Sequence, residues 1–165
     1  MTATPATSVR SSIVVEAPRE QAFSIFTEDM GSWWPPEHHI LTGELAEMVF
    51  EPRRGGHVYD RAADGSECRW ARVLVYEPPT RLVISWDINL HWQIESDPGK
   101  CSEVEVRFVP EGNDRTRVEL EHRHLDRHGE GWEGMRDAVG SPEGWAIGLG
   151  RFAQRVHDAS VKERA

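Results

Sequence analysis

Two segments of this 165-residue chain alternate charged and apolar residues without interruption. Glu103–Phe108 reads EVEVRF and Arg117–His124 reads RVELEHRH, so every second side chain of each segment faces the same side. The turn-forming residues Glu111–Asp114 (EGND) lie between them. This pattern predicts an antiparallel hairpin with one apolar face, which another layer of the protein must cover. The opposite face is expected to be solvated, and its glutamates are Glu103, Glu105, Glu119 and Glu121.

The same two-residue period predicts strands in the preceding part of the chain. We expect them at Val9–Glu16, Leu45–Phe50, His57–Arg61, Glu67–Tyr76 and Leu82–Asp87. Between the first two, Pro18–Met30 (PREQAFSIFTEDM) predicts a helix. The double proline after Trp34 prevents an ordinary helix from continuing. Two short helices are therefore expected between the first and second strands.

The last long segment, Ser141–Val161, predicts an amphipathic helix in which Ser141 is a favourable N-cap. The apolar side chains that recur on one face are Trp145, Leu149, Phe152 and Val156. Each glycine inside this helix costs about 1 kcal/mol relative to alanine. Either close packing on the sheet or, at Gly148, space for a ligand would explain them. The glycine-rich segment Gly129–Gly140 before the helix is expected to be a mobile entrance.

Together these patterns predict an α+β fold, in which one long C-terminal helix covers a seven-stranded antiparallel sheet. We expect residues 8–162 to form a single domain after a flexible tail of residues 1–7. The formal net charge of −9 argues against a nucleic acid or an acidic membrane as partner. The chain has neither a membrane-spanning apolar run nor the apolar core of a signal peptide, so a cytoplasmic location is expected. There, Cys68 and Cys101 are expected to be free thiols.

Several short motifs, in their order and spacing, resemble those of a known family. They are VVEAPREQAFSIFTE, WWPP, FEPRRGGHVYDRAADG, VYEPPTRLVISW, VELEH and SPEGWAIGLGRFA. Over about Ile13–Val156 the chain resembles the bacterial, single-domain relatives of the activator of the heat-shock chaperone ATPase, in the START-like or helix-grip superfamily (SRPBCC). The resemblance implies a curved sheet that grips the C-terminal helix and leaves a hydrophobic cavity between them.

The resemblance does not imply one activity. Members of the superfamily bind lipids, steroids or hormones, cyclise polyketides or act as co-chaperones, and they share no catalytic motif. Eukaryotic chaperone activators carry a further N-terminal domain, whereas few residues precede the first strand here. Direct chaperone activation is therefore not expected.

Tryptophan is abundant, with seven residues, and its large ring with one N–H donor suits the wall of a ligand cavity. We expect Trp34, Trp86 and Trp145 to share such a cavity. Strand alternation turns His122 and His124 toward the apolar side, where His122 is either a hydrogen-bonded structural residue or a ligand contact. The candidate ligand-binding residues are Trp34, Trp70, Trp86, Phe108, Leu120, His122, Trp145, Gly148, Leu149 and Phe152.

Three functions remain open from the sequence. The first is binding of a small apolar or aromatic molecule between sheet and helix. The second is a cyclase or lyase acting on such a molecule, with His122 or Asp87 as acid or base. The third is a co-chaperone-like interaction module. No catalytic motif, metal site or cofactor is predicted, because the histidines, including His38 and His39, match no ligand motif. A homodimer is left open.

Overall fold

The computed structural model describes residues 6–35 and 38–164. Seven strands form one antiparallel sheet in the order β1-β7-β6-β5-β4-β3-β2. The strands are β1 Val9–Val15, β2 Leu45–Phe50, β3 His57–Ala62, β4 Glu67–Glu77, β5 Arg81–Trp86, β6 Ser102–Pro110 and β7 Thr116–Arg123. The predicted α+β fold is thus confirmed. Residues 1–5 of the predicted tail lie outside the described residues, while the carbonyl of Thr7 accepts a hydrogen bond from Leu125 N at 2.9 Å.

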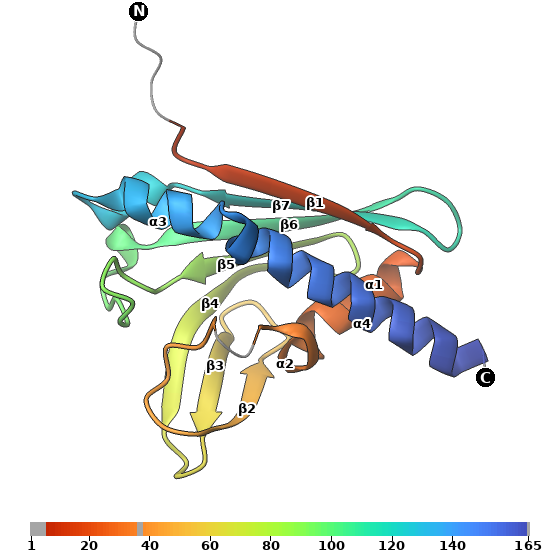
Figure 1. Cartoon of the computed structure of the whole chain (residues 1–165), viewed down its shortest axis with the longest axis horizontal. Helices are drawn as coiled ribbons and strands as arrows, with labels where there is room; N and C mark the ends of the chain where they lie inside the picture. The colour runs from red at the N-terminus through yellow and green to blue at the C-terminus, as the bar shows by residue number, and fades with distance from the viewer. Residues whose placement is uncertain (1–5, 36–37, 165) are drawn as a thin grey trace, which may run out of the picture.

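The helices lie on one side of the sheet and at its end. They are α1 Arg19–Thr27, α2 Met30–Trp33, the short turns η2 Pro98–Lys100 and η3 Leu125–His128, α3 Trp132–Val139, the wide turn η4 Pro142–Ala146 and α4 Ile147–Arg164. Figure 1 shows α4 lying across the curved sheet, with α1 and α2 on the same side. No helix in the described part of the chain combines the length and hydrophobicity needed to cross a membrane.

The sheet bends sharply along β4, so that the directions of β2 and β3 are at a steep angle to those of β6 and β7 (Figure 1). The pairing register shifts between Val58 and Tyr59 against β4, and between Val73 and Val75 against β5. Such bulges insert an extra residue into one strand and bend it. The bend leaves a concave face large enough to hold α4 together with an internal space.

One apolar core fills most of the volume between the sheet and the helices. Phe26 of α1 lies at its centre, with ring-centroid distances of 5.3 Å to Phe152 of α4 and 5.7 Å to Phe108 of β6. Arginines of α4 also bind α2: Arg151 Nε donates to the carbonyl of Trp33 at 2.9 Å. Because α2 is fixed in this way, the residue that follows it, Trp34, is held against the core.

Three sequence expectations need correction. The segment Pro18–Met30 contains a break, so that α1 ends at Thr27 and α2 begins at Met30. The segment Gly129–Gly140, expected to be a mobile entrance, contains helix α3. Its buried Met135 and Val139 are four residues apart and give the helix an apolar face.

The third correction concerns the charged face of the hairpin, where Glu105 is buried rather than solvated. Arg81 Nε donates to its carboxylate at 2.6 Å, and Arg107 and Arg123 lie within 3.3 Å of it. Burial acts to raise the pKa of Glu105, but hydrogen bonds from Arg81 and Arg107 and the nearby positive charges hold it below its ordinary value. Long arginine stems therefore cover a carboxylate that strand alternation alone places in solvent.

Candidate functional site

A cavity of about 470 Å³ lies between the sheet, α2, α3 and the start of α4. This volume is in the range of sites that hold a drug-sized molecule, about 300–1,000 Å³. The lining comes from the end of α2 and the segment after it, from the end of β5 and its loop, and from α3, η4 and α4. Its residues are Trp34, Pro35, His38, His39, Ile40, Trp86, Ile88, Trp92, Ala138, Val139, Ser141, Glu143, Gly144, Trp145 and Gly148.

Four tryptophans form a closed ring of contacts beside this cavity, and we call them the tryptophan cluster: Trp34, Trp70, Trp86 and Trp145. The successive ring-centroid distances are 5.0 Å, 5.7 Å, 5.7 Å and 5.7 Å. Three of these four pairs meet nearly edge to face, which is an arrangement that aromatic pairs prefer. Trp34, Trp86 and Trp145 line the cavity, while Trp70 supports them from β4. The rings come from four different parts of the fold, and together they form one rigid aromatic wall.

The remaining predicted residues divide into cavity and core. Gly148 of α4 lines the cavity, and a Cβ added there would meet only Trp33 Cζ3, at 3.9 Å. This is ordinary van der Waals contact, so the glycine leaves open space beside the aromatic wall. The predicted residues that do not line the cavity are buried, and they are Trp70, Phe108, Leu120, His122, Leu149 and Phe152. His124, with a φ of +59°, follows the end of β7 and is exposed.

His122 is fully buried one layer behind the cavity wall, with its ring 5.0 Å from that of Trp86. Its Nδ1 accepts the indole N–H of Trp145 at 3.1 Å. An indole can only donate, so the proton of neutral His122 is on Nε2, which donates to Ser102 Oγ at 2.8 Å. The Ser102 hydroxyl then donates to Nε2 of His128, at 2.7 Å.

Burial, with a smaller contribution from the charge of His128, lowers the pKa of His122 to about 3. The imidazole is therefore neutral at neutral pH, and no proton is available on Nδ1. In this arrangement His122 holds Trp145 in the wall of the cavity. Ligand contact would require Trp145 or Trp86 to move aside.

Sequence reasoning missed a pair of polar residues in the cavity region. Nδ1 of His39, which lines the cavity, lies 2.7 Å from Oδ2 of Asp60. Their side chains are 11% and 1% exposed. A signal was present in the sequence, because strand alternation puts Asp60 on the buried face of β3 between Val58 and Ala62. A carboxylate in an apolar register position needs a partner, but sequence alone does not reveal that it is His39.

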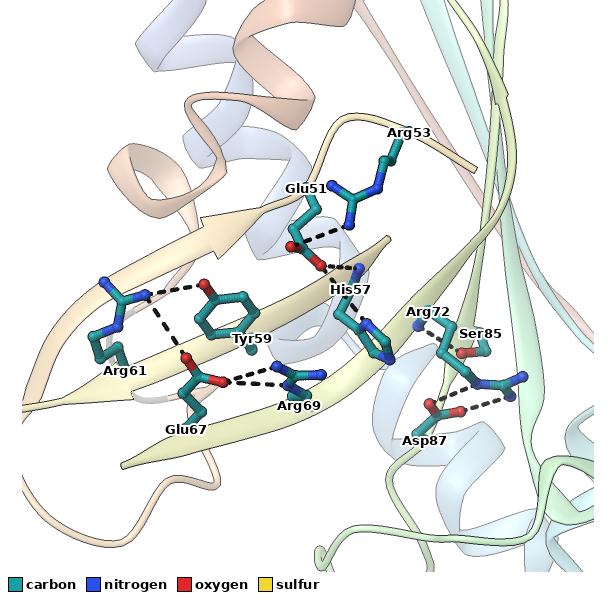
Figure 2. A network of polar contacts seen from close by, with 10 residues as sticks. All are labelled: Glu51, Arg53, His57, Tyr59, Arg61, Glu67, Arg69, Arg72, Ser85 and Asp87. Carbon is teal, nitrogen blue, oxygen red and sulfur yellow. Dashed lines mark hydrogen bonds and ion pairs between the residues drawn. The ribbon is translucent and has the colours of Figure 1, made fainter. Parts of the chain in front are cut away.

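Asp87, the carboxylate considered as an acid or base, lies on the other face of the sheet. It follows Trp86, whose side chain faces the cavity, so the alternation of the chain turns Asp87 away. Arg72 binds both of its oxygens, with Nε at 3.0 Å and Nη2 at 3.1 Å (Figure 2). The hydroxyl of Ser85 accepts the backbone N–H of Arg72 at 2.8 Å. Asp87 thus belongs to a structural ion pair outside the cavity.

Comparison with known proteins agrees with this architecture. The family model described as Activator of Hsp90 ATPase homolog 1-like protein matches residues 16–156. The chain belongs to this family. The family is one of START-like, helix-grip proteins, and the curved sheet around α4 is its fold. The match extends over six of the seven strands, all except β1, and over α4 as far as Val156.

Two solved structures have at least 30% sequence identity to the chain. The anthrahydroquino-gamma-pyrone synthase Txn09 is 44% identical with a TM-score of 0.63, and the match covers 89% of this chain and 95% of that one. The self-sacrificing resistance protein CalC from Micromonospora echinospora is 30% identical with a TM-score of 0.66, covering 92% and 95%.

A third structure is similar in fold alone. Protein NE0264 from Nitrosomonas europaea is 14% identical with a TM-score of 0.67, and the match covers 94% of this chain and 99% of that one. Comparison with curated proteins gives no match. In the described parts of this family member, no three His, Cys, Asp or Glu side chains gather closely enough to hold a metal ion.

Proposed function

We propose that this protein binds a flat, fused-ring aromatic molecule in the cavity between the sheet and α4. The observation that carries the proposal is the wall formed by Trp34, Trp86 and Trp145 beside about 470 Å³ of space. A flat aromatic molecule buries the most surface when it lies against such rings, with edge-to-face or offset geometry. A flexible aliphatic ligand would gain burial but would not use the shape of the wall.

Polar groups around the same cavity define the expected chemistry further. His38 and His39 lie on one side, and Ser141 and Glu143 lie near η4. A few polar groups around an apolar wall orient a ligand that carries hydroxyl or carbonyl oxygens. The 44% identity to a synthase of an anthrahydroquinone-fused pyrone supports the same ligand class. We therefore infer an oxygenated polycyclic aromatic ligand.

Titration with 2-hydroxyanthraquinone, followed by quenching of tryptophan fluorescence, tests the binding proposal. Gly148→Leu places a side chain in the cavity without meeting the backbone, whereas Gly150 on the same helix is exposed. Both changes replace a helical glycine by leucine, so they have similar effects on helix propensity. We expect Gly148→Leu to weaken affinity at least tenfold, about 1.4 kcal/mol, and Gly150→Leu to leave it unchanged. Equal affinity of both variants would place the ligand elsewhere.

A second candidate function is ring closure on the bound molecule. It is favoured by the identity to Txn09, which covers 95% of that synthase. The test is incubation with a hydroxyanthraquinone that carries an unsaturated ketone beside its hydroxyl group. Conversion to an isomer of equal mass but different retention, at a rate proportional to protein concentration, would support this function. A bound but unchanged compound would leave ligand binding as the function.

A further inference from the structure

We propose that His39, held by Asp60, takes the proton of a hydroxyl group on the ligand in this cavity. The inference rests on the proposed binding function and adds the group that performs acid–base chemistry there. His39 is the candidate catalytic residue because it lines the cavity. Asp60 is a positioning residue, because it acts through the imidazole and does not itself line the cavity.

The hydrogen bond between the two side chains determines which nitrogen can accept a proton. A carboxylate only accepts, so the 2.7 Å contact requires a proton on Nδ1 of His39. In the neutral imidazole, Nε2 then carries the lone pair. Within residues 6–35 and 38–164, no hydrogen-bond partner of Nε2 is present. The nitrogen that can act as a base is thus the one left for a ligand.

Asp60 is well placed to stabilise the imidazolium that forms. It lies on β3 between two strand neighbours, paired with Met48 of β2 and with Cys68 of β4. Its second oxygen, Oδ1, is buried without a hydrogen-bond partner among the described residues, so His39 is its one polar contact there. A buried carboxylate aimed at Nδ1 orients the ring and holds the proton on that nitrogen, as in other His–carboxylate pairs.

The other ionisable groups near this pair do not replace it. Burial, and then the charge of Asp60, raise the pKa of Cys68, so that thiol stays neutral beside the carboxylate. Glu143 lines the cavity but is exposed. His122 is buried behind Trp145 and uses Nδ1 to accept the indole N–H. Among the residues that the structure describes, only His39 combines contact with the cavity and a hydrogen bond from its ring to a buried carboxylate.

The proton balance of a ring closure is complete with this pair alone. The ligand O–H bond breaks, its proton moves to Nε2 of His39, and the oxygen adds to an unsaturated carbon conjugated with a carbonyl group. A C–O bond forms, the C–C π electrons move to the carbonyl as an enolate, and His39 returns the proton to carbon. The sum is an isomerisation that consumes no oxidant, reductant or other reactant. The pair acts first as base and then as acid.

The test uses 2-hydroxyanthraquinone bound to the protein, because its phenolate form absorbs at longer wavelength than its phenol form. Absorbance is recorded against pH for wild type, His39→Gln and Asp60→Asn. We expect the phenolate to appear about one pH unit lower in wild type than in either variant, since the pair stabilises the ionised ligand. Fluorescence quenching at low pH measures the affinity of each protein for the phenol form, and each titration is recorded at a dye concentration that saturates that protein. His39 lies in the segment between α2 and β2, whereas Asp60 is buried within β3, so His39→Gln keeps the test valid even where Asp60→Asn reduces folding.

A matched control is available on the other side of the sheet. His57 Nδ1 lies 3.6 Å from Glu51 Oε1, a second histidine–carboxylate pair, but His57 does not line the cavity (Figure 2). His57→Gln is expected to leave the titration of the bound dye unchanged. The inference is overturned if His39→Gln binds the dye and titrates it as wild type does. If the wild-type protein does not bind the dye, the proposed function is overturned, and this inference with it.

Discussion

The indole N–H of Trp145 donates to Nδ1 of fully buried His122 across 3.1 Å, and this bond ties the cavity wall to the interior of the sheet. Beyond His122, the same chain of hydrogen bonds reaches Ser102 and His128. Each member fixes the proton position of the next, because the indole at one end can only donate. Trp145 is thus positioned by a polar contact as well as by ring packing.

Replacing Trp145 by phenylalanine tests this contact. The change keeps an aromatic ring in the wall but leaves Nδ1 of His122 buried without a donor, which costs about 1–3 kcal/mol. We expect the free energy of unfolding in urea to fall by that amount. Trp132→Phe is the control, since no partner for its indole N–H exists among the described residues. Equal losses in both variants would show that ring size alone matters.

Protonation of His122 is expected to destabilise the fold in acid. Its folded pKa of about 3 is below its ordinary value of 6.5, so the folded protein binds fewer protons than the unfolded chain in this interval. Its contribution to stability is complete above 6.5 and is lost as pH falls toward 3. Burial likewise lowers the pKa of His128, despite an opposing effect of Glu95, so its contribution has the same sign.

The measurement is urea unfolding of wild type and His122→Asn between about pH 7 and about pH 5, where carboxylates change little. For the wild type, the free energy of unfolding should decrease by up to about 1.4 kcal/mol per pH unit through His122 alone. The asparagine variant keeps an acceptor near Trp145 but does not titrate, so its slope should be smaller by that amount. Parallel slopes would mean that His122 is not the titrating group.

Gly144 is required inside η4, the wide turn that leads into α4. Its backbone is non-helical, with φ −89° and ψ −126°, and an added Cβ would lie 2.2 Å from the carbonyl oxygen of Val139. Because backbone has to move, we expect Gly144→Ala to lower the free energy of unfolding by about 1–3 kcal/mol. Gly134→Ala in α3 meets no atom within 4 Å, so it should gain up to about 1 kcal/mol. Thermal and urea unfolding of both variants check the contrast.

Asp87→Asn should affect stability and leave ligand binding unchanged. The change weakens the bond to Arg72 on the far face of the sheet, and loss of a charged hydrogen bond costs about 1–3 kcal/mol. Affinity for 2-hydroxyanthraquinone is expected to equal that of wild type, because Asp87 does not line the cavity. A variant that folds normally but fails to bind would return Asp87 to the list of functional candidates.

The sheet and its hairpin could be predicted because strand alternation is a local property. The predicted segments Leu45–Phe50 and Glu103–Phe108 lie within or coincide with β2 and β6. Alternation predicts which face of the sheet a side chain is on, but not whether other side chains separate it from the cavity on that face. His122 therefore shares a face with Leu120, yet Trp86 and Trp145 separate it from the cavity.

The site itself was less accessible to sequence reasoning. Trp34, Trp86 and Trp145, expected to share one cavity, do line the same space, and their contact with a ligand is a proposal that the titration tests. The pair of His39 and Asp60 depends on the path of the chain after α2 and on the register of β3 beside it. Neither follows from local periodicity, so only the folded arrangement brings these two residues together.

In helix α4 and the turn before it, different residues line the cavity and pack in the core. Trp145 and Gly148 border the cavity, while Leu149, Phe152 and Val156 belong to the core. A Cβ added at Gly148 would meet only the ring of Trp33 within 4 Å. Selection for a different ligand size and selection for folding can therefore act on different residues of the same helix. A single substitution at the cavity can then change the space for a ligand while the core residues of α4 stay the same.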